Sequence, residues 1–329
     1  MTRIPIAVSC SLEGGKMFKN QWCRLAGLIV VPLMIFIMPV AVQAQLSDTT
    51  AFLAHVSNEY RIVPNVVYHE ANNHENALDV YLPTNTSEAT PVLVMFHGGG
   101  WVLGNRHSMT LRALPYLEMG WAVVNVSYRL VQVSRAPAAV EDGLCAMQWI
   151  ARNAEQYNFD LARIVTTGTS AGGHLALTSG MVPVEAGLAL ECVSGGFRGP
   201  SAITSVDVAA VINWYGISDL PDLLEGQNTR GYAVQWFGGL ANRDDVASAV
   251  SPLTYVRSGL PAILSIHGDA DPIVPYQQAT SFHAKLEDAG VPNELHTVSG
   301  GGHGGFNREE TLDIYQTIQA FLDRNGLGQ

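Results

Sequence analysis

The stretch RIVTTGTSAGGHLALT, residues 163–178, is the strongest indication of fold in this chain. Its first part, Arg163–Thr167, is rich in β-branched residues and predicts a buried strand, whereas Gly173–Thr178 is typical of a helix. Between them Ser170 stands in the pattern Gly-x-Ser-x-Gly, whose glycines let strand and helix backbones approach without an intervening Cβ atom. The pattern predicts a sharp strand-to-helix turn that projects the Ser170 hydroxyl outward at a helix N-terminus, where developing negative charge is stabilised.

A second glycine-rich motif, His97–Trp101, follows the apolar run Val92–Phe96. Its three successive glycines leave backbone N–H groups uncrowded by side chains, as stabilisation of a tetrahedral oxyanion requires. A phosphate-binding loop would need GxxxxGK[ST] or GxGxxG, and neither pattern is present in this loop. We therefore expect Gly99 and Gly100, together with the N–H group of Ala171, to form an oxyanion hole.

A serine hydroxyl becomes a good nucleophile only with a general base and a carboxylate that orients the base. Two aspartates, Asp269 and Asp271, follow the apolar run Ala262–Ile266, at the strand edge where α/β sheets place their sites. We favour Asp271, because Asp269 is closer to the strand end and is expected to accept hydrogen bonds from turn N–H groups. Further on, His303 stands on a glycine-rich loop and is the predicted base for Ser170.

Several other polar and aromatic residues lie near the predicted strand ends. Trp101, Trp214 and Tyr215 are predicted to contact substrate, with core packing as the alternative. Arg129 and Asp142 are expected to form a buried structural ion pair.

The remaining histidines are expected to have structural roles or to lie on the surface without a catalytic role. His97 should brace the glycine loop through a ring hydrogen bond, and His174 and His267 should be buried. Six others lie on segments that look exposed: His55, His69, His74, His107, His283 and His296. Metal ligation would need two or three histidines at short helical or hairpin spacing, as in HExxH, and this spacing is not seen, so we expect no metal.

Short apolar runs alternate with helix-like stretches along the chain, which predicts an α/β fold with a mostly parallel sheet covered on both faces. The predicted parallel strands are Val92–Phe96, Ala122–Val126, Arg163–Thr167, Val208–Trp214 and Ala262–Ile266, and a short run Glu294–Val298 precedes the loop of His303. Asn65–His69 and Ala77–Leu82 alternate and predict an antiparallel pair. Helices are expected at Pro137–Tyr157 and Arg308–Arg324. Two stretches without clear periodicity, 181–205 and 217–260, are predicted to form a partial lid, with plain surface loops as the alternative.

The N-terminal residues 1–44 are expected to be a secretory signal peptide. A basic segment precedes an apolar run from Leu25 to Val42, and small residues lead to predicted cleavage after Ala44. The alternative is an uncleaved membrane anchor, although Pro32 and Pro39 interrupt its helix. The start at Met1 or at Met17 is left open. Residues 46–329 are expected to form one domain, exported to the periplasm or the medium.

Composition narrows the possible partners. Hydrophobic residues make up 47% of the chain and charged residues only 14%, which excludes wholesale disorder. The net charge of −11 argues against nucleic acid as a partner. Removal of residues 1–44 leaves Cys145 and Cys192, and an oxidising compartment permits either a disulfide or two separate buried thiols. No stable membrane association is expected once the signal is removed, and the oligomeric state is open.

These motifs together resemble the α/β-hydrolases, and within them the bacterial esterases of the feruloyl-esterase-like (BD-FAE) and hormone-sensitive-lipase groups. The resemblance covers roughly Val66 to Leu322 and is carried by Leu78–Pro83, His97–Trp101, Ser127–Leu130, Gly168–His174, His267–Pro275 and His303. It implies an eight-stranded sheet and an acyl-enzyme mechanism without a cofactor. In that mechanism Ser170 is the nucleophile, His303 the base and Asp271 its orienting acid, in the family's chain order.

The acid motif departs from the hormone-sensitive-lipase group, which usually carries Asp-Pro-Leu. The pattern His-Gly-x-x-Asp at 267–271 resembles the feruloyl-esterase and prolyl-oligopeptidase branches instead. The expected function is a secreted serine carboxylic ester hydrolase acting on short-chain, acetyl or hydroxycinnamoyl esters, free or linked to polysaccharide. Two alternatives remain open, a prolyl-oligopeptidase-like exopeptidase and a non-catalytic binding protein that keeps the fold.

Overall fold

The computed structural model describes residues 48–84, 86–193 and 206–328. The predicted signal peptide and its cleavage position lie outside these residues, as do residues 194–205 of the first predicted lid stretch. No helix within the described ranges is both long and apolar enough to cross a membrane.

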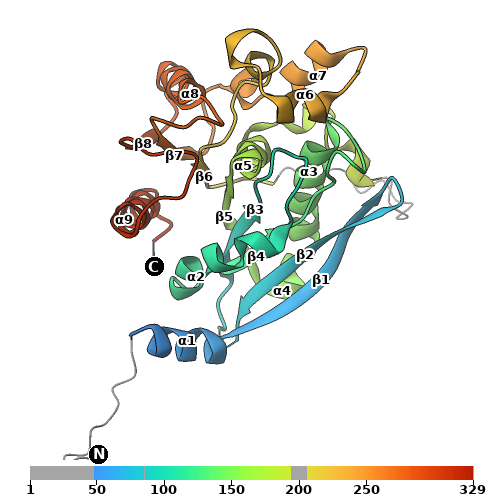
Figure 1. Cartoon of the computed structure of the whole chain (residues 1–329). Helices are drawn as coiled ribbons and strands as arrows, with labels where there is room; N and C mark the ends of the chain where they lie inside the picture. The colour runs from blue at the N-terminus through green and yellow to red at the C-terminus, as the bar shows by residue number, and fades with distance from the viewer. Residues whose placement is uncertain (1–47, 85, 194–205, 329) are drawn as a thin grey trace, which may run out of the picture. The chain divides into compact units, whose positions relative to one another are not determined.

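Eight strands form a single sheet in the order β1-β2-β4-β3-β5-β6-β7-β8 (Figure 1). Their bounds are β1 Tyr60–Ala71, β2 His74–Pro83, β3 Thr90–Phe96, β4 Ala122–Val126, β5 Phe159–Thr169, β6 Ala210–Trp214, β7 Ala262–Gly268 and β8 Asn293–Val298. β1 pairs with β2 and β2 with β4 in antiparallel fashion, and every later pair is parallel. The predicted α/β fold with a mostly parallel eight-stranded sheet is confirmed.

The strands with continuous apolar sequences are those that are buried on both faces of the sheet. β3, β4, β6 and β7 are buried along their whole length. Strands covered on both faces need apolar or small residues at every position, which gives a continuous apolar run in the sequence. In the edge strand β1, by contrast, only two of the twelve residues are buried.

Helices cover both faces of the sheet (Figure 1). Side chains of α2 and α9 pack with one hydrophobic cluster, and those of α3, α5 and α8 with the other. The helix bounds are α1 Asp48–Glu59, α2 Thr110–Glu118, α3 Ala138–Arg152, α4 Ala154–Tyr157, α5 Ala171–Met181, α6 Gly231–Phe237, α7 Arg243–Ala249, α8 Gln277–Asp288 and α9 Arg308–Arg324. The predicted helix at Pro137–Tyr157 is thus divided between α3 and α4. α9 has the predicted bounds, and a capping box between Asn307 and Glu310 satisfies its first N–H groups.

The two predicted lid stretches fold differently from each other. Residues 217–260 contain α6, α7 and three short 3-10 turns, η4 Pro221–Leu223, η5 Gly226–Asn228 and η6 Pro252–Tyr255. The described part of the other stretch holds two more turns, η2 Val184–Ala186 and η3 Leu190–Val193, and η1 Arg106–Met109 precedes α2.

Strand register brings the loops with motif residues to one edge of the sheet. Phe96 at the end of β3 pairs with Gly168 of β5, which in turn pairs with Asn213 of β6. Trp214 pairs with Ile266 of β7. Since parallel strands end at the same edge, the glycine loop, the serine turn and the acid loop emerge side by side there.

Candidate active site

The serine turn has the backbone geometry that its glycines predict. Ser170 adopts φ 56° and ψ −121° directly before α5, a conformation that L-residues rarely adopt. A Cβ atom at Gly168 would lie 2.3 Å from the carbonyl oxygen of Gly172, and one at Gly172 would lie 2.1 Å from that of Phe96. The Ser170 N–H group donates to the Trp214 carbonyl at 2.9 Å, which ties the turn to the end of β6. Strain of this kind persists only where the surrounding structure imposes it.

The predicted base and acid are in contact. Nδ1 of His303 lies 2.7 Å from Oδ2 of Asp271. The other oxygen, Oδ1, accepts hydrogen bonds from the N–H groups of Ile273 and Val274 at 2.7 and 3.0 Å. The competing candidate, Asp269, instead accepts a hydrogen bond from the Gly300 N–H group at 2.6 Å, as the sequence led us to expect.

The electrostatic environment keeps Asp271 ionised. Burial by itself raises the pKa of Asp271, but hydrogen bonds from His267, His303 and the N–H groups of Val274 and Ile273 together lower it well below its usual range. The carboxylate can therefore orient the His303 ring and stabilise the imidazolium that forms when the ring accepts a proton.

Ser170 and His303 line one cavity of about 580 Å³ at the strand edge. Gly98, Gly99 and Gly100 of the glycine loop line the same cavity. The third predicted oxyanion donor, Ala171, is buried at the first position of α5. The structure therefore brings the predicted nucleophile and base together with the glycine backbone around one space.

The glycine loop requires its glycines. Gly99 has φ 120°, and a Cβ atom there would lie 1.9 Å from the Leu103 carbonyl oxygen. That close approach belongs to a tight turn in which the N–H groups of Val102 and Leu103 both donate to the Gly99 carbonyl. Gly100 has φ 61°, and its missing Cβ leaves room for the side chain of Tyr232.

His97 braces this loop. Its ring Nδ1 lies 2.8 Å from the Gly98 carbonyl oxygen, and the ring stacks on Tyr128 with centroids 4.2 Å apart. Burial lowers the pKa of His97 to about 4, against a smaller opposite effect of that hydrogen bond. The ring is therefore neutral near pH 7. It lies outside the cavity lining, which agrees with a bracing role.

The three aromatic residues predicted to contact substrate separate into two groups. Tyr215 lines the cavity, and its ring lies 4.6 Å from that of His303 between centroids. Trp101 and Trp214 do not line it, so for them the prediction is corrected to core packing. Trp101 is fully buried and stacks on Trp236 at 4.2 Å. Trp214 is buried at the end of β6, and the guanidinium group of Arg112 lies 5.2 Å from the centroid of its ring.

Several residues of the cavity wall belong to no motif that could be recognised in the sequence. Tyr232 and Gln235 come from α6, within the predicted lid stretch 217–260, and Leu103 and Ile273 flank the glycine loop and the acid. The first two stand three residues apart on a helix, which places both on one face. The described part of the other lid stretch, residues 181–193, contributes nothing to this cavity.

The remaining histidines follow the expectations only in part. His174 is buried with Nε2 2.7 Å from the Val250 carbonyl oxygen, and His267 is fully buried at the end of β7. His69 and His283, however, are also buried, although their segments look exposed in the sequence. The reason for His283 is a contact distant in sequence, since its Nδ1 lies 2.8 Å from the side-chain oxygen of Asn293.

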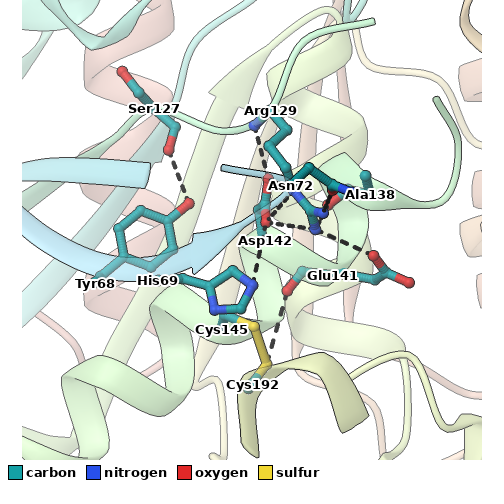
Figure 2. Close-up of polar contacts among 10 residues, drawn as sticks. All are labelled: Tyr68, His69, Asn72, Ser127, Arg129, Ala138, Glu141, Asp142, Cys145 and Cys192. Carbon is teal, nitrogen blue, oxygen red and sulfur yellow. Dashed lines mark hydrogen bonds and ion pairs between the residues drawn. A yellow bond between two sulfur atoms is a disulfide. The ribbon is translucent and has the colours of Figure 1, made fainter. Parts of the chain in front are cut away.

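Arg129 and Asp142 form the expected buried pair, shown in Figure 2. Both the backbone N–H group and the guanidinium group of Arg129 bond the fully buried carboxylate, and Glu141 contacts the same guanidinium at 3.2 Å. None of the three lines the candidate site. The pair fixes the chain after β4 to the start of α3.

Cys145 of α3 and Cys192 of η3 are joined in a disulfide, also visible in Figure 2. The bond connects α3 with η3 and joins two cysteines that are 47 positions apart in the sequence. Of the two alternatives that the sequence left open, the structure has the bridge.

Comparison with known proteins agrees with this architecture. The BD-FAE family model matches residues 78–286. The chain belongs to the BD-FAE family. Its similarity to esterases covers most of the described chain: esterase LipQ of Mycobacterium tuberculosis is 28% identical over 77% of this chain, and esterase LipC of the same organism 30% identical over 69%. This BD-FAE chain spans 59% and 56% of the length of those two relatives.

Solved structures of esterases share the fold of this BD-FAE protein. The propionate-bound thermophilic esterase Est2 of Thermogutta terrifontis has a TM-score of 0.66 and 26% identity, covering 82% of this chain and 96% of its own. A truncated carbohydrate esterase from gut microbiota has a TM-score of 0.64 and 25% identity, covering 81% and 96%. The architecture is that of the α/β-hydrolase esterases.

Proposed function

We propose that this protein is a serine carboxylic ester hydrolase that acts through an acyl-enzyme, with Ser170 as nucleophile, His303 as general base and Asp271 as its orienting acid. The observation that carries the proposal is that Ser170 and His303 line one cavity while Nδ1 of His303 rests on Asp271. The relatives named as esterases support the same class of reaction.

In the first half of the reaction, Ser170 Oγ attacks the ester carbonyl carbon while Nε2 of His303 accepts the hydroxyl proton. The negative charge that develops on the carbonyl oxygen is stabilised by N–H groups of Gly99, Gly100 and Ala171. The tetrahedral intermediate collapses by breaking the bond to the alcohol oxygen, which takes the proton from His303. The alcohol leaves and the acyl group stays on Ser170.

In the second half, water attacks the acyl carbon and gives a proton to His303. Collapse of this intermediate breaks the bond to Ser170 Oγ, which recovers the proton, and the carboxylic acid leaves. No redox change occurs, and water is the only co-reactant. Ser170, His303, Asp271 and the backbone N–H groups, together with water, therefore account for a complete hydrolysis.

The proposed substrates are small neutral esters with acetyl, short-chain or hydroxycinnamoyl groups, including those linked to polysaccharide. Among the residues that the structure describes, no Asp, Glu, Lys or Arg side chain lines the cavity. Leu103 and Ile273 give the cavity an exposed apolar rim suited to a short apolar or aromatic acyl group. A propionate-bound esterase and a carbohydrate esterase among the structural neighbours favour the same range.

We further propose that the protein is exported and that residues 1–44 are removed. The basic segment, apolar run and small residues before Ala44 support this proposal. N-terminal sequencing of protein recovered from the periplasm or medium should begin at Gln45. Recovery of an intact N-terminus in the membrane fraction would instead favour the anchored alternative.

The test of the reaction compares wild-type protein with Ser170→Ala on p-nitrophenyl esters of rising chain length, methyl ferulate and acetylated xylan. The variant should lose turnover by about 10⁶-fold and lose labelling by a fluorophosphonate probe. Ser179→Ala is the matched control, because Ser179 is a buried serine of α5, the helix that follows Ser170, and its hydroxyl has no hydrogen-bond partner among the described residues. Wild-type activity in Ser170→Ala would refute the nucleophile assignment, and faster cleavage of aminoacyl p-nitroanilides than of esters would favour an exopeptidase.

A further inference from the structure

A second histidine contacts the acid of the candidate triad. His267 stands near the end of β7 and is fully buried, and its Nε2 lies 3.3 Å from Oδ2 of Asp271. The same oxygen atom lies 2.7 Å from Nδ1 of His303. One carboxylate oxygen is therefore shared by two imidazole rings from different parts of the chain.

The hydrogen-bond partners assign the hydrogen on the His267 ring. Nε2 faces two acceptors, the Asp271 carboxylate and the carbonyl oxygen of Val274 at 3.1 Å. A ring nitrogen without hydrogen at this position would set its lone pair against both oxygens, so Nε2 carries the hydrogen and donates. The single Nε2 hydrogen is therefore directed at both the Val274 carbonyl oxygen and Oδ2 of Asp271, in addition to the two backbone donors on Oδ1.

The position of the His267 ring is itself rigid. β7 lies between β6 and β8 in the sheet, and His267 is in register with Thr297 of β8. Tyr276 packs edge-on against the ring with centroids 5.6 Å apart. A donor held this firmly restricts rotation of the Asp271 carboxylate, whereas the His303 loop on the other side is rich in glycine.

We propose that His267 is a positioning residue of the reaction, holding the Asp271 carboxylate in the orientation in which it accepts the hydrogen bond from His303. The inference rests on the proposed function, in which Asp271 orients the base. His267 does not line the cavity in which substrate is proposed to bind. It acts through Asp271, and its loss should lower kcat and leave KM unchanged, because only the alignment of the base changes.

Three variants separate the donor from the space that the ring fills. His267→Gln can place an amide donor near the Nε2 position, His267→Met fills similar volume without a donor, and His267→Asn is polar but too short to reach. We expect His267→Met and His267→Asn to lower kcat by about 10- to 100-fold, and His267→Gln to keep most of the activity. If His267→Met fails to fold, comparing His267→Asn with His267→Gln still tests whether a donor at the Nε2 position is required.

A proton NMR measurement makes the test independent of turnover. The hydrogen between His303 and Asp271 should give a resonance downfield of the amide region in wild type and in His267→Gln, and this signal should broaden or vanish in His267→Met. Equal kcat and an unchanged signal in His267→Met, with only a lower melting temperature, would overturn the proposal, as would equal losses in the glutamine and methionine variants. If the wild type hydrolyses no ester, the proposed function fails, and the NMR signal still decides the role of His267.

Discussion

His303 Nδ1 lies 2.7 Å from Asp271 Oδ2, although the two residues are 32 positions apart in the chain. α8 and β8 separate them in sequence, and the parallel pairing of β7 with β8 returns the chain to the same edge of the sheet. The helix α8 forms the crossover connection that parallel strands require, and it brings the two loops after β7 and β8 next to each other. The contact gives a carboxylate partner to a histidine on an otherwise glycine-rich loop.

Replacing Asp271 by Asn should disable the base without unfolding the protein. The amide would keep the size of a buried side chain but no longer stabilise the imidazolium of His303. We expect kcat to fall by about 10⁴-fold, as in other Ser-His-Asp hydrolases, with a smaller effect on KM. Steady-state kinetics on p-nitrophenyl acetate measure both.

Asp269→Asn is the matched control, because Asp269 lies two residues away and accepts its hydrogen bond from the Gly300 N–H group. An amide oxygen can accept the same bond, so kcat should stay within about twofold of wild type. A greater loss in Asp269→Asn than in Asp271→Asn would contradict the choice of acid.

Gly99→Ala should strongly lower activity by displacing the backbone of the glycine loop. The added Cβ would lie 1.9 Å from the Leu103 carbonyl oxygen, at a φ of 120° that side-chain-bearing residues rarely adopt. The loop must move, and the N–H donors move with it, so we expect a loss of at least about 100-fold in kcat. Gly239→Ala provides the comparison, since nothing lies within 4 Å of a Cβ atom there. Wild-type kinetics in Gly99→Ala would show that this loop does not hold the oxyanion.

Tyr215 should support the base through its ring. The ring centroid lies 4.6 Å from that of His303, whereas the hydroxyl accepts a long hydrogen bond from Arg112 at 3.5 Å. We expect Tyr215→Phe to stay near wild type and Tyr215→Leu to lose about tenfold in kcat. Equal losses in both variants would show instead that the hydroxyl group is the functional part.

Acidification should destabilise the protein through His174. Burial lowers the pKa of His174 to about 4, against a smaller opposite effect of its hydrogen bond to Val250. Above the unfolded pKa of about 6.5, neither the folded nor the unfolded state binds the proton. Between pH 6.5 and about 4 only the unfolded chain binds it, so the free energy of unfolding decreases as the pH is lowered through this range. The full loss is about 3 kcal/mol and is complete below the folded pKa.

Urea unfolding at pH 7 and pH 4.5 measures this loss directly. His174→Gln keeps a donor for the Val250 carbonyl but does not titrate, so its stability should depend less steeply on pH over this interval. His97, with its own pKa lowered to about 4, continues to contribute in both proteins. Parallel curves for wild type and His174→Gln would count against the assignment.

The disulfide should stabilise the fold without affecting the reaction. Cys145 and Cys192 do not line the cavity, and their bond closes a loop of 47 residues in the unfolded chain. Replacing both by Ala should lower the free energy of unfolding by about 2–4 kcal/mol and leave kcat unchanged at moderate temperature. Titration of the denatured, unreduced protein starting at residue 46 should find no free thiol, and two free thiols would contradict the bridge.

Features that depend only on residues close together in the chain could be predicted from the sequence. The serine turn follows from local backbone geometry. Only glycine fits at positions 168 and 172, because a Cβ atom there would collide with the backbone of Gly172 and of Phe96. The buried strands follow from continuous apolar runs, and α9 from its capping residue and helical spacing. The α/β fold could therefore be predicted before any contact was known.

The folded arrangement of the chain fixes which distant side chains come into contact. It turned Tyr215 toward the cavity and Trp214 into the core, although the two are adjacent, and it placed Tyr232 of α6 in the cavity wall. It also set His267 against the oxygen that His303 uses. Such contacts depend on strand register, the crossing of loops from different strands and the side to which each residue points, and none of these is encoded in a short stretch of sequence.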